Sequence, residues 1–540
     1  MNSANERVFR SGDKEELGRV QKELRQKIRK GKDNYRRKLE KWLEQNKARD
    51  VWSGLQNIAG HRKGVGRDQA SVHYPPLNPP LRLSPLITPT PPPQSSSTPL
   101  SITDDQVRTQ LRNIKGWKAP GPDGISPRLL KDCADQLCGV FRHLFNLSLS
   151  LEKVPALWKT SCVVPVSKTP HPKEPNHFRP VALTSHLMKT MERIILRHLR
   201  TLVGTQLDSL QFAYQPGIGV DDALIYMLHR SLLHLEGSGS TVRVMFFDFS
   251  SAFNTIKPSL LKVKMGVEDG TWEWTDTWLH GQQTISPTDH TQVLSPFLFT
   301  LYTSDFTHNT THCHIQKFSD DTAIVGCVSE GNDLEYRTVI RDFVSWSELN
   351  QLQLNTSKTK EMIVNFRRKA SHFTPVNIQG LDIEVVESYK FLGVHLNNKL
   401  NWTDNTHALY KKGQSRLHLL RRLRSFGVCK ALLRTFYDSV MASAIFYAVV
   451  CWRAGSTDRD RSRLNKLIRR ASSVLDGPLD SIEELGERRM LTKLTSIMDN
   501  TSHPLHDTVG SLRSSFSSRL LHPRCKKERF RRSFIPAAVR

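Results

Sequence analysis

Three aspartates stand where apolar segments end, a place where carboxylates can meet outside a sheet. Asp248 follows the nearly continuous apolar run 242–247, a pattern typical of a strand that is buried on both faces. Asp320 and Asp321 lie between two further apolar runs, at the predicted tip of a β-hairpin. An Asp pair in a turn is common by itself, because Asp side chains bond to the turn backbone. A catalytic role is therefore indicated only when Asp248, Asp320 and Asp321 are considered together.

Three carboxylates that converge in a folded protein need cations. Two carboxylates ~4 Å apart repel by about 4 kcal/mol at an effective dielectric of about 20. Mg²⁺ prefers such oxygen ligands, and two metal ions held together stabilise the attacking and leaving oxygens of a phosphoryl transfer. We therefore predict a metal-dependent phosphoryl-transfer site at Asp248, Asp320 and Asp321.

The elements that must position these acids follow from the hydrophobic pattern. Strands are predicted at 160–165, 241–249, 314–318, 322–328 and 361–366. Helices are predicted at 103–114, 185–202, 221–235 and 334–350, and the pattern becomes helical and basic from 407 to about 475. This alternation predicts a mixed α/β centre.

Charge and composition limit the class of protein. The 540 residues include 78 Lys and Arg against 52 Asp and Glu, a net charge of +26, which indicates an anionic partner and most often a nucleic acid. The eight cysteines form no CxxC pair, so a disulfide framework and a zinc ribbon are not expected. The first thirty residues contain no apolar leader, and no stretch approaches the ~20 uncharged apolar residues of a membrane span. We expect a soluble, intracellular protein in the cytoplasm, the nucleus or both.

The N-terminal part differs in composition from the rest of the chain. Residues 13–46 are rich in Lys, Arg and Glu with apolar residues near a 3.6-residue period, which predicts one or two basic amphipathic helices. Such a helix is either a solvated helix laid over the protein or an arm that contacts nucleic acid. Residues 74–99 contain too many prolines for a helix or a central strand, so they are predicted to be an extended linker.

The aspartate motifs resemble those of a known family. Residues 248–256 (DFSSAFNTI) and the box Phe318-Ser319-Asp320-Asp321 resemble the reverse transcriptases of non-LTR (LINE-like) retrotransposons, most closely the fish-type group called CR1, L2 or Rex. The resemblance implies that Asp248, Asp320 and Asp321 are the catalytic metal ligands of two Mg²⁺ ions, with Mn²⁺ as a substitute. It also implies that Phe253 is the aromatic gate that excludes a ribose 2′-hydroxyl and favours dNTPs.

Motifs outside the aspartates agree with this resemblance. Residues 121–125 (GPDGI) resemble the start of the fingers region, and 211–217 (QFAYQPG) resembles a QFAYRP segment in which Gln215 replaces the usual Arg. The resemblance implies that Lys168 and Arg179 grip the incoming triphosphate, for which Arg is suited by its bidentate geometry and Lys by its point charge.

Two later motifs complete the set. Lys358 resembles the lysine that protonates the pyrophosphate leaving group, although an exposed charged turn explains it equally well. Residues Phe391, Leu392 and Gly393 resemble the primer-grip hairpin, and the basic helices after it resemble a thumb that holds a duplex by its phosphates.

The resemblance implies an α+β fold shaped as a right-hand polymerase, in which the palm is an antiparallel sheet. The expected partners are an RNA template, a DNA primer and dNTPs, without a membrane. Residues 1–70 are expected to be a basic helical arm, and residues 71–100 a Pro/Ser-rich linker. An N-terminal extension with the fingers is expected at 101–240 and the palm at 241–400. Thumb helices are expected at 401–475 and a basic C-terminal tail at 476–540.

The chain departs from the family before Val293. Relatives carry Pro-Gln-Gly there, and here Asp289-His290-Thr291-Gln292 precedes Val293, which adds side-chain bulk where a Gly lets backbone approach a ligand. The stretch 257–291 is also shorter than in relatives, through a deletion or an error of gene modelling. The sequence begins in the connecting arm, without the endonuclease that usually precedes the polymerase, and stops just short of where relatives end. We therefore expect a fragmentary or decaying copy of an element.

These departures leave two leading hypotheses for function. One is RNA-directed DNA synthesis, and the other is an inactive remnant that still binds nucleic acid through its positive charge. A third hypothesis is a group II intron maturase or an RNA-directed RNA polymerase. Phe253 argues against RNA synthesis, and the segment DFSSAFNTI favours the LINE type.

Overall fold

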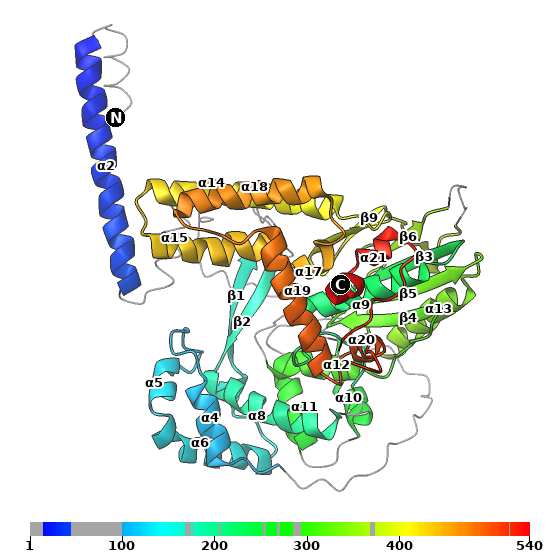
Figure 1. Cartoon of the computed structure of the whole chain (residues 1–540). Helices are drawn as coiled ribbons and strands as arrows, with labels where there is room; N and C mark the ends of the chain where they lie inside the picture. The colour runs from blue at the N-terminus through cyan, green and yellow to red at the C-terminus, as the bar shows by residue number, and fades with distance from the viewer. Residues whose placement is uncertain are drawn as a thin grey trace. The chain divides into compact units, whose positions relative to one another are not determined.

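The computed structural model describes most of the chain in two compact units (Figure 1). One unit comprises Met1–Pro85 with Asn401–Met490, and the other comprises Leu86–Leu400 with Leu491–Arg540. The described residues are 14–44, 54, 100–167, 174, 177–204, 207–250, 252, 255–266, 271–283, 293–367, 373–517 and 519–540.

An antiparallel sheet of four strands is the centre of the larger unit. The strands lie in the order β4-β5-β3-β6. Their bounds are Ser240–Phe247 (β3), Cys313–Phe318 (β4), Asp321–Ser329 (β5) and Lys360–Asn365 (β6). The strands predicted in this region and the mixed helix-and-sheet class are confirmed. The strand predicted to reach residue 249 ends two residues earlier, and Phe249 makes only an isolated bridge to Leu354.

Helices cover both faces of this sheet, which explains why β3 is apolar along its length. On one face lies α9 (Val220–His234), where the Gln316 amide on β4 donates to Ala223 O at 3.3 Å. On the other face lies α13 (Leu334–Leu349). A Cβ added to Gly326 would lie 2.6 Å from the Tyr336 ring, so only glycine lets α13 approach β5 this closely.

The one charged residue within β3 has buried partners. Arg243 is 1% exposed and donates to both carboxylate oxygens of Glu361 on β6, at 2.7 and 2.9 Å. It also pairs with Asp333, at the start of α13. The guanidinium is therefore neutralised inside the core, which a buried charge requires.

Helices and a small sheet precede the central sheet. The helices are α4 (Asp104–Arg112), α5 (Pro127–Asp132), α6 (Ala134–Ser150), α7 (Ala156–Lys159) and α8 (His186–Leu202). The helix predicted at 185–202 is confirmed, whereas the one predicted at 103–114 ends at Arg112. Strands β1 (Ser161–Ser167) and β2 (Phe178–Thr184) form an antiparallel pair. Between β3 and β4 lie α10 (Pro258–Met265), α11 (Thr271–Gln283) and α12 (Leu294–Tyr302).

The GPDG motif folds against the start of α8. A Cβ on Gly121 would lie 2.8 Å from the Cα of Ser185, so this close backbone approach requires glycine. The Ser185 hydroxyl donates to the Asp123 carboxylate at 2.5 Å and accepts from Leu187 N at 3.1 Å, which caps α8. The motif therefore fixes where α8 begins.

Two small hairpins and the C-terminal segment complete the larger unit. The hairpins are β7 (Asn377–Ile378) with β8 (Leu381–Asp382), and β9 (Ser388–Phe391) with β10 (Val394–Asn397). Beyond α19 (Ile482–Asp499) and α20 (His506–Gly510), the short helices α21 (Glu528–Arg531) and α22 (Phe534–Val539) pack on α9.

The smaller unit is helical and basic. Its helix α2 (Lys14–Glu44) carries twelve basic and six acidic residues, and it is a single helix where one or two were predicted. The second half of α2 contacts the end of α14 (Thr403–Ser425), where Lys32 Nζ donates to Ser425 O at 3.2 Å. A Cβ on Gly413 would lie 2.8 Å from Leu467, so α14 packs closely on α18 (Asp458–Leu475).

The segment Lys430–Trp452 is long and apolar enough, by length and composition alone, to cross a bilayer, although it includes the charged residues Lys430, Arg434 and Asp438. It is broken into α15 (Lys430–Phe436), a π-helical turn (Tyr437–Ala442), α16 (Ser443–Ile445) and α17 (Val449–Trp452). Its window is 56% buried, as in core helices of soluble proteins, so it is weak evidence for a membrane span.

Candidate active site

The turn that carries two of the aspartates is a tight hairpin between β4 and β5. Phe318 pairs with Asp321, so Ser319 and Asp320 alone form the turn. Ser319 has a φ of +61°, a conformation that glycine or asparagine usually supplies. A serine stays there only because the surroundings hold it.

Gln211 provides that support from a distant part of the sequence. Its side-chain oxygen accepts from Ser319 N at 2.9 Å, and its side-chain nitrogen donates to Ser319 O at 3.4 Å. The Tyr214 hydroxyl lies 3.3 Å from the Ser319 hydroxyl. The QFAY segment therefore supports the aspartate turn, a role that its sequence did not reveal.

Gln211→Leu should loosen this turn. The substitution removes the acceptor of the buried Ser319 N–H, which costs about 1–3 kcal/mol and corresponds to about a 5- to 150-fold loss of amide protection. Hydrogen exchange of the peptide that covers 319–321 measures the effect. Gln215→Leu, four residues further on, is the matched control. Equal exchange of this peptide in Gln211→Leu and in the unmodified chain would contradict the role assigned to Gln211.

The register of the sheet brings Asp248 to the same end as this turn. Phe247 pairs with Thr322, so the next residue along β3 lies beside Asp321. The backbone there is fixed from the other side, because Asn355 N donates to Asp248 O at 2.8 Å. Asp248 thus leaves the strand beside the hairpin tip, as the sequence predicted.

The three carboxylates act on one another electrostatically. Burial and the neighbouring charges of Asp320 and Asp248 raise the pKa of Asp321 to about 6, although its side chain lies at the exposed end of β5. Lys358 Nζ lies 3.3 Å from Asp248 Oδ2, with 67% of the lysine side chain exposed. An ion pair this exposed contributes little stability, so the lysine is able to leave the carboxylate for another anion.

The chemistry of this donor set fits a divalent cation. Hard carboxylate oxygens whose mutual repulsion raises a pKa are stabilised by Mg²⁺ or Mn²⁺. Within the described residues, no group of three or more His, Cys, Asp and Glu side chains is already arranged around one metal position. The aspartates are therefore neighbours by register and by charge, without a formed three-ligand cage.

The β9–β10 hairpin lies beside the aspartates. The Tyr389 ring stacks on Phe246 of β3 with centroids 4.2 Å apart, and Phe391 follows at 5.1 Å. Burial and the charges of Asp321 and Asp248 raise the pKa of Tyr389. Its turn contains Leu392 and Gly393, both at positive φ. The sequence resemblance assigns residues 389–394 to a primer-grip hairpin, a role that stays a prediction.

Comparison with known proteins accounts for this arrangement. The family described as reverse transcriptase (RNA-dependent DNA polymerase) matches residues 171–396, which include the three aspartates and the β9–β10 hairpin. A reverse transcriptase domain is thus present in the chain. A further family, described as alkylated DNA repair protein alkB homolog 8, N-terminal, matches residues 402–443.

Proteins of mobile elements are similar to the chain over and beyond the reverse transcriptase domain. The RNA-directed DNA polymerase from mobile element jockey of Drosophila melanogaster is 25% identical over 412 residues, covering 69% of this chain and 44% of that protein. The probable RNA-directed DNA polymerase from transposon X-element of the same species is 23% identical over 440 residues, covering 75% and 47%. A Pol polyprotein from type-1 retrotransposable element R1 of Bradysia coprophila is 22% identical over 387 residues, covering 66% and 37%. The chain spans less than half the length of these curated relatives.

Several predicted site residues of the reverse transcriptase domain fall outside the described residues. These are Lys168, Phe253 and the departure at 289–292. Arg179 is described only in its backbone, which pairs with Val166 in the β1–β2 sheet. The described structure thus brings together Asp248, Asp320, Asp321, Lys358 and the β9–β10 hairpin, and the triphosphate-gripping roles stay predictions.

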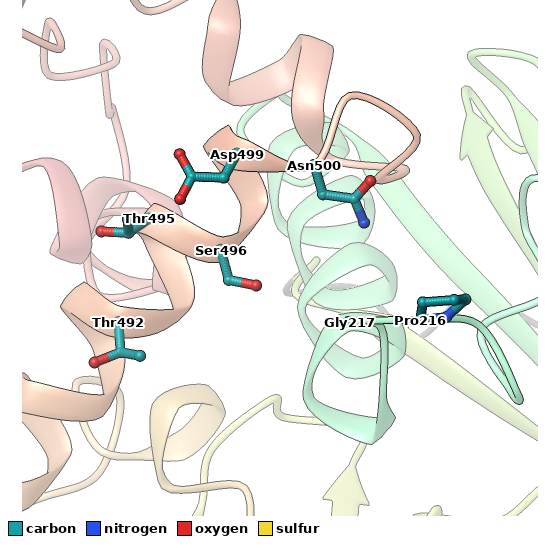
Figure 2. Close-up of a pocket in the computed structure, with 7 residues that line it drawn as sticks. All are labelled: Pro216, Gly217, Thr492, Thr495, Ser496, Asp499 and Asn500. Atoms are coloured by element: carbon teal, nitrogen blue, oxygen red, sulfur yellow. The ribbon is translucent and has the colours of Figure 1, made fainter. Parts of the chain in front are cut away.

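A pocket of about 800 Å³ lies between the loop that follows the QFAY segment and the end of α19 (Figure 2). It is lined by Pro216, Gly217, Thr492, Thr495, Ser496, Asp499 and Asn500, and the three aspartates are not among these lining residues.

Buried Asp222 joins the two sides of this pocket. Its carboxylate accepts hydrogen bonds from Gly219 N at 2.8 Å and from Lys493 Nζ at 2.9 Å, and it lies 3.0 Å from His503 Nε2. Burial by itself raises the pKa of Asp222, but these contacts outweigh burial and lower the pKa below its usual value. The Lys493 ion pair and the His503 contact fasten the C-terminal segment of the larger unit to the start of α9.

Proposed function

We propose that the chain derives from an enzyme that copies RNA into DNA, with the aspartate site as its catalytic centre. The observation that carries the proposal is the convergence of Asp248 and the Asp320–Asp321 turn at one end of the antiparallel sheet, within the region that matches reverse transcriptases. The primer 3′-hydroxyl would attack the α-phosphate of a dNTP, and pyrophosphate would leave.

Each residue of the site has a role in this proposal. Asp248, Asp320 and Asp321 would hold two Mg²⁺ ions, which would supply charge stabilisation for the attacking and leaving oxygens. Lys358 leaves its exposed pair with Asp248 and donates a proton to the leaving pyrophosphate. The β9–β10 hairpin supports the primer end.

The residues whose side chains lie outside the described structure complete the nucleotide site. Lys168 and Arg179 bind the triphosphate, and Phe253 excludes ribonucleotides.

The proposal includes a right-hand arrangement. The antiparallel sheet of residues 241–400 is the palm, residues 101–240 carry the extension and the fingers, and the helices of 401–475 are the thumb. Residues 1–70 are a basic arm, 71–100 a linker and 476–540 a basic tail. The partners are an RNA template, a DNA primer and dNTPs, which meet inside the cell. Within the non-LTR elements we assign the chain to the fish-type CR1, L2 or Rex group, from its motifs.

A second candidate function rests on the departure before Val293. The residues Asp289-His290-Thr291 add bulk where relatives have Pro-Gln-Gly, so the chain as it stands would bind template and primer with little or no synthesis. Both candidates require nucleic-acid binding, and they differ in catalysis.

Binding of an RNA–DNA hybrid should be tight and steeply dependent on salt. The helices α14 and α18 carry twelve basic and three acidic residues, and contacts to phosphates release counterions. We expect log K to fall linearly with log[salt] with a slope of about −0.9 per phosphate neutralised on duplex DNA and about −0.7 on single strands. Fluorescence anisotropy of the full chain with labelled RNA and hybrid measures this slope.

The contribution of α14 can be separated by substitution. Lys411→Gln with Arg421→Gln removes two exposed cations and should make the slope shallower by about 1 per lost phosphate contact. Asp404→Asn on the same helix is the control and should not make it shallower. Weak binding at low salt, or a flat salt dependence of the unmodified chain, would overturn the proposal.

A further inference from the structure

A buried carboxylate joins three helices of the larger unit. Glu192 on α8 is fully buried. Its oxygens accept from the Trp278 indole N–H of α11 at 3.3 Å and from Val293 N at 2.8 Å. Val293 is the residue from which α12 begins. One side chain thus bonds to α11 and to the first turn of α12 at the same time.

The end of α12 that Glu192 contacts needs such an acceptor. The first N–H groups of a helix have no partner within the helix, and the helix dipole makes this end positive. Val293 occupies the N-cap position, and its apolar side chain makes no capping bond. The Glu192 carboxylate accepts from the N–H of this N-cap residue, from another helix.

Burying a carboxylate here is costly, so a purely structural core would favour an apolar residue. Burial raises the pKa of Glu192 to about 7, against the opposing effects of the Val293 N–H, Lys189, the Trp278 indole and Arg193. The charged groups that act on it, Lys189 and Arg193, both lie on α8. From α11 and α12 it meets only the neutral indole and backbone N–H groups within the described residues.

We propose that Glu192 is a positioning residue that fixes the start of α12 against α8 and α11, and thereby sets where the chain at Val293 enters the nucleotide site. The second half of this statement rests on the proposed function, because that function places the segment before Val293 beside the dNTP. The first half stands on the described contacts alone.

The positioning role predicts a pH-dependent change at the start of α12. The Val293 N–H lowers the pKa of Glu192, so an opening that breaks this bond and leaves Glu192 buried takes up a proton, and protection of this amide, corrected for intrinsic exchange, should fall as pH drops below about 7. Because a bond to the neutral carboxyl is weaker than one to the carboxylate, protection should fall about 10-fold. Hydrogen exchange of peptides covering 293–297, followed from pH 5.5 to 8.5, measures it.

Two variants separate positioning from general stability. Glu192→Gln keeps the volume and removes the charge, so it should reduce protection at 293–297 at pH 8 and abolish the pH-dependent step. Thr190→Val on the same helix changes a fully buried residue whose hydroxyl donates to His186 O, so it should leave both unchanged. The same pH step in Glu192→Gln as in the unmodified chain would overturn the proposal.

A binding assay tests the link to the nucleotide without requiring catalysis. The protein is bound to a hybrid whose primer ends in a dideoxynucleotide, and the next complementary dNTP is added. If the dNTP binds, the resulting ternary complex releases its hybrid more slowly when a competitor hybrid is added. In the chain whose turn before Val293 has been restored, Glu192→Gln should weaken dNTP affinity about 10-fold or more and leave hybrid affinity unchanged. If this restored chain forms no ternary complex, the dNTP site of the proposed function fails, while hydrogen exchange still decides the role of Glu192 at α12.

Discussion

Asp248→Asn and Asp320→Asn should each abolish DNA synthesis in a chain whose turn before Val293 has been restored, and leave binding of template and primer nearly unchanged. Each change removes a metal-ligand charge and keeps the side-chain volume. Metal-ion stabilisation of the transition state is worth several kcal/mol, and each 1.36 kcal/mol is tenfold in rate, so the loss should be at least ~10³-fold. Extension of a DNA primer on poly(rA) with Mg²⁺ and dNTPs measures the rate.

The control for these variants removes one negative charge elsewhere. Asp342 lies exposed on α13, and Asp342→Asn should extend the primer at the unmodified rate. If Asp248→Asn and Asp320→Asn both extend the primer at the unmodified rate, these acids are not the metal site.

Restoring the turn before Val293 should increase synthesis by about 100-fold or more. In the remnant hypothesis, Asp289-His290-Thr291 stand at the positions of the family's Pro-Gln-Gly and add side-chain bulk there, and misplacing reacting groups by ~1 Å can cost about 10²-fold in rate. We expect the chain as it stands to bind hybrid with nearly no extension. The restored chain takes Pro-Gln-Gly, together with the shortened segment before it, from a relative.

A control that adds one side-chain carbon tests whether lost synthesis results from blocking the close approach of the turn backbone to the nucleotide. Restoration with Pro-Gln-Ala adds a single Cβ at the glycine position, so it should recover much less synthesis than Pro-Gln-Gly. Robust extension by the unrestored chain would overturn the remnant hypothesis. No recovery after restoration would place the damage elsewhere.

The sequence predicted the elements of the central sheet because burial leaves a local signature. The apolar run before Asp248 and the two runs around Asp320 each predicted a strand, and the structure places strands there with ends that differ by a residue or two. The convergence of the acids followed from the ends of these strands, since antiparallel register places them together.

The supporting residues were not predictable in the same way, because their partners are far away in the sequence. Gln211 contacts Ser319, 108 residues later, and Glu192 contacts Val293, 101 residues later. Only Glu192 could have been noticed in the sequence, because it is a charged residue within the apolar stripe that includes Met188 and Ile195 of α8. A charged residue in such a stripe indicates a buried partner, although the stripe does not identify it.

Primer extension on an RNA template by the turn-restored chain, with Mg²⁺ and either dNTPs or NTPs, is the most direct test of the central claim. The proposed function predicts Mg²⁺-dependent extension with dNTPs and little with NTPs, because it assigns to Phe253 the exclusion of a 2′-hydroxyl. Absence of extension with dNTPs while the hybrid is bound, or equal use of NTPs, would contradict it.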